Sequence, residues 1–179
     1  MDLLATLILA HLIADFPLQT NAVFRLKNRH WVGVLLHAAI HVMVTGLLLQ
    51  NPLGHWPMLV SLGGIHFITD WLKLRMKFKR RSLGFVLDQA AHGLALYLLA
   101  TWPVETTGIL PAVYLHPAVA YALIPALLMF ASILTEDLRE SATRLPYSPN
   151  KTPQIILLSH WLGYPLVVLV VMLRLGVWQ

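Results

Sequence analysis

The chain has 179 residues, of which 58% are hydrophobic and only 12% are charged. Soluble domains carry roughly 25% charged residues, so this composition excludes an ordinary soluble protein, which would lack the polar surface to cover itself. The chain has no cysteine, which excludes disulfides and thiolate chemistry. Its net charge of +5 does not indicate nucleic-acid binding, because the basic residues lie between apolar segments.

Six apolar segments follow one another, at residues 3–19, 31–49, 57–73, 82–102, 116–135 and 154–175. A helix rises about 1.5 Å per residue, so about 20 residues cross a hydrocarbon core of about 30 Å. Lipid-exposed backbone must satisfy its own hydrogen bonds, which favours helices. We therefore predict an all-α, polytopic transmembrane helix bundle of about six spans. The first segment has no basic leader and contains His11 and Asp15, so we expect a retained span rather than a signal peptide.

Basic residues mark one side of the membrane. Twelve of the 13 Lys and Arg residues lie in the segments 20–30, 73–81 and 136–152, whereas the segments 50–56 and 103–115 contain none. Cytoplasmic loops carry an excess of Lys and Arg, so the three basic loops are predicted to be cytoplasmic. Both termini are then expected outside the cytoplasm.

The first four segments each carry two ionisable side chains four residues apart. The pairs are His11 and Asp15, His37 and His41, His66 and Asp70, and Asp88 and His92. This spacing places both members of a pair on one face of a helix. The recurring order predicts a tandem repeat of two hairpins around a polar core. We therefore divide the chain into a four-helix His/Asp core at 1–105 and two further transmembrane helices with a cytoplasmic loop at 106–179.

The helix direction alternates along the chain, and the residue order reverses with it, so the pairs predict two stacked polar layers. The layer near the bilayer centre would contain His11, His41, His66 and His92. The layer nearer the cytoplasm would contain Asp15, His37, Asp70 and Asp88. An ionised side chain at the centre of a membrane helix costs about 2.5–3.5 kcal/mol on insertion scales. Eight such residues therefore need mutual compensation.

A metal ion would supply that compensation, because imidazole and carboxylate are natural ligands of zinc, iron and manganese. Two metals about 3.5–4 Å apart would suit eight ligands in two layers. We predict that the eight residues bind one or two divalent transition metals, with zinc favoured over iron or manganese. Two other interpretations stay open: the pairs hydrogen-bond only to pack the helices, or they line a path for protons or ions.

Four other polar residues lie near these pairs or in the sixth segment. Lys73 extends the face of His66 and Asp70 and is predicted to reach the membrane interface. Gln19 and Gln89 could each bind a ligand or serve helix packing, and packing is favoured. His160, in the sixth segment, could join the cluster but has no ionisable partner four residues away.

The ordered motifs also carry a resemblance. The series HxxxDFxxQ from His11, HxxxH from His37, HxxxDxxK from His66 and DQxxH from Asp88 resembles a family of small bacterial integral membrane proteins known as a domain of unknown function. The resemblance covers about residues 1–105 and does not include the last two spans. It implies a protein of the bacterial inner (cytoplasmic) membrane, and it implies no reaction.

The residues favour a membrane-embedded metal-dependent hydrolase acting on a lipid or lipid-linked substrate. The metal would lower the pKa of bound water toward about 7, and Asp15, Asp70 and Asp88 are the candidates to take the proton. The alternative is a transporter or channel for divalent metal ions or protons, and a third hypothesis is a haem protein with two axial histidines. No glycine-rich phosphate cradle or HExxH motif is present. The expected partners are membrane lipids.

Overall fold

The computed structural model describes residues 2–101, 106–143 and 152–176, and this part of the chain is all-α, as predicted. Its helices are α1 (Asp2–Asp15), α2 (Asn21–Arg29), α3 (Trp31–Leu48), the 3-10 turn η1 (Leu53–His55), α4 (Trp56–Arg75), α5 (Arg81–Ala100), α6 (Ala112–Thr143) and α7 (Thr152–Arg174). The predicted domain boundary at residue 105, and residues 144–151 of the third basic loop, lie outside the described residues.

The six predicted spans correspond to α1, α3, α4, α5, α6 and α7. Within the described residues, three helices are long and apolar enough to cross a membrane, namely α3, α5 and α6. The apolar stretches Leu3–Asp15 of α1 and His160–Arg174 of α7 are shorter. Helix α4 has 20 residues but is less apolar, and it contains His66, Asp70, Lys73 and Arg75. Length and composition thus support three spans, fewer than the six expected.

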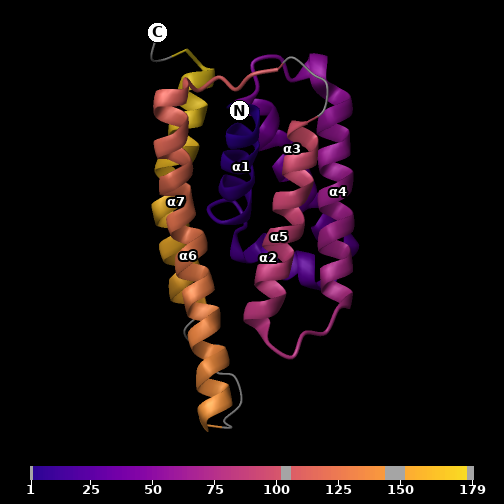
Figure 1. The fold of residues 1–179 in the computed structure, drawn as a ribbon, viewed down its shortest axis with the longest axis vertical. Helices are drawn as coiled ribbons and strands as arrows, with labels where there is room; N and C mark the ends of the chain where they lie inside the picture. The colour runs from indigo at the N-terminus through magenta and orange to yellow at the C-terminus, as the bar shows by residue number, and fades with distance from the viewer. Residues whose placement is uncertain (1, 102–105, 144–151, 177–179) are drawn as a thin grey trace.

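Helix α1 is enclosed by the rest of the bundle. Figure 1 shows α6 and α7 together on one side of α1, with α3, α4 and α5 on the other. Helix α1 contacts α3, α5, α6 and α7. It buries apolar side chains around its whole circumference, among them Leu7, Leu9 and Ile13, as a helix at the centre of a bundle must. The last two helices, α6 and α7, complete the cover around α1.

Two apolar clusters hold the bundle together. The larger one joins α1 and α3 to α6 and α7. The smaller one joins α1, α4, α5 and the end of α3, and it contains Leu3, Leu7, Leu49, Met58, Leu62, Leu96 and Leu99. These leucines and the methionine precede the ionisable pairs on α1 and α4 and follow them on α3 and α5. The smaller cluster therefore closes the polar core toward the end of the bundle where α1 begins (Figure 1).

The segment 20–30 was predicted to be a basic loop, and this prediction was wrong. It forms the helix α2, whose first turn is capped by the hydroxyl of Thr20, which accepts a hydrogen bond from the backbone N–H of Val23. Helix α2 packs tightly on α3 at Gly33. A Cβ at Gly33 would overlap the backbone of Leu26 and Lys27. The glycine thus permits the close approach that places Lys27 in the interior.

Substituting Gly33 with alanine is expected to destabilise the protein by about 1–3 kcal/mol, the usual cost of overpacking, because the added methyl group meets backbone rather than a flexible side chain. Unfolding in detergent micelles would measure the change. The matched control is Gly64→Ala, since nothing lies within 4 Å of a Cβ at Gly64. Equal stabilities of the two variants would contradict the tight α2–α3 contact.

Helix α5 is fixed to α6 at its first turn. The carboxylate of Asp137 accepts hydrogen bonds from the backbone N–H of Ser82 at 2.7 Å and from its hydroxyl at 2.6 Å. Asp137 also lies 3.6 Å from the guanidinium of Arg81. An acidic residue at a helix N-terminus satisfies free N–H groups and complements the helix dipole. This contact between distant segments fixes the height of Asp88 and His92 in the bundle.

Candidate metal centre

The eight ionisable residues converge in the interior of the four helices α1, α3, α4 and α5. The imidazoles of His11, His37, His41, His66 and His92 are all buried. Asp70 and Asp88 are buried as well, and the side chain of Asp15 is 9% exposed. Each pair points inward because its two members share one helix face.

His66 lies at the centre of the histidines. Its ring centroid is 3.5 Å from that of His41, 4.2 Å from that of His92 and 5.2 Å from that of His37. The ring of His11 is 5.7 Å away. All four partners come from other helices, so this histidine connects the two predicted hairpins. Five imidazoles this close together could not all be protonated without strong repulsion.

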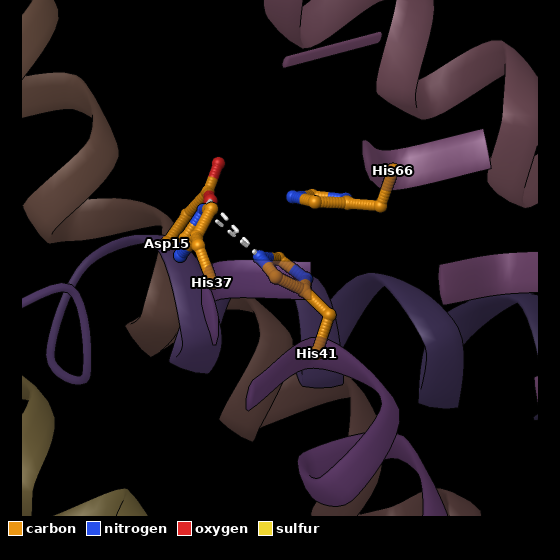
Figure 2. Close-up of side chains that lie close together, drawn as sticks. All are labelled: Asp15, His37, His41 and His66. Carbon is orange, nitrogen blue, oxygen red and sulfur yellow. Dashed lines mark hydrogen bonds and ion pairs between the residues drawn. The ribbon is translucent and has the colours of Figure 1, made fainter. Parts of the chain in front are cut away.

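The carboxylate of Asp15 contacts three of the imidazoles. Its Oδ1 lies 3.0 Å from Nε2 of His37 and 3.1 Å from Nε2 of His41, and its Oδ2 lies 3.3 Å from Nε2 of His11. Figure 2 shows Asp15, His37 and His41 together, with the ring of His66 pointing toward them from α4. These four residues can offer ligand atoms that all lie within 4.8 Å of one another.

A second set of ligand atoms comes from His66, Asp70 and His92, and these atoms also lie within 4.8 Å of one another. Because His66 belongs to both sets, the two sets are adjacent. A carboxylate with two or three imidazoles is a donor set typical of zinc, iron and manganese sites. The described residues therefore contain two neighbouring groups that could each hold a metal ion.

The hydrogen bonds of His92 leave one nitrogen ready for a metal. Its Nδ1 lies 2.9 Å from the backbone carbonyl of Asp88. A carbonyl can only accept, so Nδ1 carries the proton, and Nε2 of a neutral ring then has a free lone pair. That Nε2 is buried with no hydrogen-bond partner, and so is Nε2 of His66. Metal-ligating histidines usually donate their other N–H to a carbonyl or carboxylate in this way.

Two lysines neutralise two of the carboxylates. Nζ of Lys27 lies 2.7 Å from Oδ2 of Asp70, and Nζ of Lys73 lies 2.5 Å from Oδ2 of Asp88. Lys27 was expected only as a topology signal, and no local pattern could have revealed its partner. Lys73 was predicted to reach the interface, but its ammonium turns to Asp88. The motif HxxxDxxK places Lys73 one turn from Asp70, and this spacing could have indicated that Lys73 lies near the carboxylates of the cluster.

Gln89 also has a role that sequence reasoning missed. Its amide nitrogen donates to Oδ2 of Asp15 at 3.1 Å and to Oδ2 of Asp88 at 3.4 Å, and its amide oxygen lies 3.4 Å from Nε2 of His11. The amide thus connects the two carboxylates rather than serving packing alone. His160 lies outside the cluster, with Nε2 3.3 Å from the backbone carbonyl of Gln19.

A cavity of about 530 Å³ opens beside the cluster. Asp15, Asp88 and Gln89 form part of its wall, together with Lys27 and Lys73. The rest of the lining is largely apolar and includes Phe16, Phe24, Phe78, Phe85, Met129 and Ile133. The cavity lies on the side of the cluster nearer α2 and the α4–α5 connection. Of the three carboxylates, Asp70 does not line it.

The sequence matches one family model over residues 3–116, described as "Protein of unknown function (DUF3307)". The chain belongs to the DUF3307 family. The match extends somewhat further than the predicted residues 1–105 and includes all eight cluster residues. No curated protein and no solved structure matches the chain significantly.

Proposed function

We propose that this DUF3307 protein is a membrane-embedded metal-dependent hydrolase whose substrate is a lipid or lipid-linked molecule. The observation that carries the proposal is the position of Asp15 and Asp88, which belong to the His/Asp cluster and also line the cavity. Charged side chains and metal-ligand atoms beside a largely apolar cavity are a typical arrangement for catalysis on an apolar molecule.

The residues divide into roles by their contacts. Asp15 with His37, His41 and His66 would hold one divalent metal, and Asp70 with His66 and His92 would hold a second or share the first. Zinc is the favoured metal, with iron or manganese as alternatives. A metal bound there would activate a water molecule and polarise an ester or phosphoryl oxygen.

Asp88 is our candidate for the proton acceptor. It belongs to neither ligand set, it lines the cavity, and its Oδ1 is buried without a hydrogen-bond partner. Nζ of Lys73 lies 2.5 Å from its Oδ2, which leaves Oδ1 as the atom that could take a proton. Asp15 and Asp70 were equal candidates on sequence grounds. Asp15 lies among three imidazoles and is better placed as a ligand, and Asp70 is held by Lys27 away from the cavity.

For the membrane arrangement we propose six crossings of the bacterial inner membrane, with both termini outside the cytoplasm. The direction of the helices supports this, because α1 begins and α7 ends at the same end of the bundle (Figure 1). Helix α2, which carries three of the basic residues, lies toward the other end. Reporter fusions at each terminus are expected to give periplasmic signals. A cytoplasmic signal from either terminus would overturn this topology.

Transport of metal ions or protons is the alternative function. The smaller apolar cluster argues against it, since Leu7, Met58, Leu62 and Leu96 close the polar core on the side away from the cavity. A path for ions needs polar groups or water on both sides of the site. The haem hypothesis is disfavoured by packing, because the rings of His41 and His66 are 3.5 Å apart and leave no space for a macrocycle between them.

The proposed activity is tested with purified protein in lipid nanodiscs, loaded with zinc, iron or manganese and incubated with bacterial membrane lipids. Mass spectrometry of the lipid pool should reveal a product that accumulates with wild-type protein. The variant His41→Ala with His66→Ala should form none. A metal-loaded wild type that releases no product, but moves zinc or protons across proteoliposomes, would exclude the hydrolase and establish the transporter.

A further inference from the structure

We propose that the substrate of this centre is a phosphorylated amphiphile whose phosphate binds beside the metal cluster and Lys73, and whose apolar chain lies along the cavity wall. The inference rests on the proposed hydrolase function and adds the chemical class of its substrate. It follows from the polarity of the cavity, the charge of the cluster and the free donors of Lys73.

The cavity is lined by both polar and apolar side chains. Asp15 and Asp88 are joined in its wall by the amide of Gln89, and Phe85 of α5 and Met129 of α6 belong to the apolar lining. Its volume of about 530 Å³ lies within the range of roughly 300–1,000 Å³ that is usual for small-molecule sites. This volume and this mixed lining fit a headgroup together with the adjoining part of a hydrocarbon chain.

The charges of the cluster favour an anionic headgroup once metal is bound. Three carboxylates and two lysines give the cluster a net charge of −1 with neutral imidazoles, and the lysines are already paired with Asp70 and Asp88. One divalent ion changes this sum to +1, and two ions change it to +3. Buried charge must be compensated, so the metal-loaded centre favours a substrate with negative charge. A phosphate monoester carries about −1.5 to −2 near neutral pH and has three acceptor oxygens.

Lys73 is placed to contact such a phosphate. Its side chain is 33% exposed and lines the cavity, while its ammonium lies 2.5 Å from Asp88. An ammonium has three N–H donors, so two remain after the bond to Asp88. Arg81 also lines the cavity and is already paired with Asp137 and Glu140. Lys73 is therefore the cation that would link the phosphate to the proton acceptor.

The experiment compares three probes on metal-loaded protein in detergent: a monoacylglycerol phosphate, the monoacylglycerol with the same chain, and inorganic phosphate. Binding is measured by isothermal titration calorimetry. The phosphorylated lipid should bind about tenfold tighter or more than its neutral counterpart, the effect of one charge-assisted hydrogen bond. It should also bind tighter than inorganic phosphate, because the chain buries apolar surface.

Two variants test the two parts of the proposal, the contact with the phosphate and the position of the apolar chain. Lys73→Gln should reduce the preference for the phosphorylated lipid, measured as the ratio of the affinities for the two lipids on the same variant. Ser132→Trp, on the α6 wall, should block both lipids while leaving metal content intact, because Ser132 lines the cavity and belongs to neither ligand set. The matched control is Ala131→Trp, an exposed neighbour on the same helix that should bind both lipids as the wild type does.

Equal affinities for the two lipids on protein that holds its metal would overturn the phosphate inference and leave the hydrolase proposal standing. Inorganic phosphate that binds as tightly as the phosphorylated lipid, or a Ser132→Trp variant that binds lipid normally, would overturn the placement of the chain. Metal analysis of the same samples separates these results from failure of the proposed function. Wild-type protein that takes up no metal would contradict both proposals.

Discussion

Replacing Asp88 with asparagine is expected to lower substrate turnover by about 10²–10⁴-fold while leaving the bound metal in place, because a positioned proton acceptor contributes about that much. Asparagine has nearly the shape of aspartate but cannot take a proton. Asp88 belongs to neither of the two ligand sets, so its loss should not release metal. Asp15→Asn should behave differently, because Asp15 does belong to one set and its loss should lower metal content together with activity.

Turnover and metal content are measured on the same preparations, with the product followed by mass spectrometry. Glu140→Gln is the matched control, since this carboxylate pairs with Arg81 and does not line the cavity. It should keep both metal and activity. Asp88→Asn protein that turns over as fast as the wild type would remove Asp88 from the proposed role. Loss of metal from that variant would instead make Asp88 a ligand.

Replacing Lys27 with methionine is expected to destabilise the protein by about 3–5 kcal/mol, the usual cost of leaving one member of a buried ion pair uncompensated. Nζ of Lys27 lies 2.7 Å from Asp70, whose side chain is only 1% exposed, so water cannot replace the lysine. Methionine keeps most of the apolar volume of the side chain. The loss would therefore reflect charge rather than packing.

Unfolding of chelator-treated protein by a denaturing detergent would measure this loss without a contribution from metal. Arg25→Met on the exposed face of α2 is the control and should have little effect. The double variant Lys27→Met with Asp70→Asn should recover much of the stability, since no unpaired charge remains. A double variant as unstable as the sum of the two single variants would show that the ion pair contributes nothing.

The convergence of the ionisable pairs could be predicted because helical periodicity is local. A spacing of four residues places His66 and Asp70 on one face wherever α4 lies, and the cost of burying them requires the faces to meet. The reversal of residue order with helix direction then predicts that the four pairs lie at matching depths in the bundle. The central position of His66, which contacts the other four imidazoles, depends on how the helices rotate and could not be read from the sequence.

Most of the contacts that could not be predicted from the sequence join segments distant along the chain. The partner of Lys27 depends on how closely α2 approaches α3 at Gly33, which is a tertiary feature. The capping of α5 by Asp137 likewise joins residues 55 positions apart. The cavity forms where α1, α2, α4, α5 and α6 meet. The six spans were assigned from apolar length, whereas α1 ends after 14 residues because the chain turns at Phe16 and Pro17.

Elemental analysis of protein purified without chelator measures whether the His/Asp cluster of the DUF3307 protein binds a divalent transition metal. We expect stoichiometric metal in the wild type, none in the variant His41→Ala with His66→Ala, and an unchanged amount in His160→Ala, a buried histidine outside the cluster. If the pairs only hydrogen-bond, the double variant should lose stability with no change in metal content. Wild-type protein with only traces of metal would show that the cluster is not a metal centre.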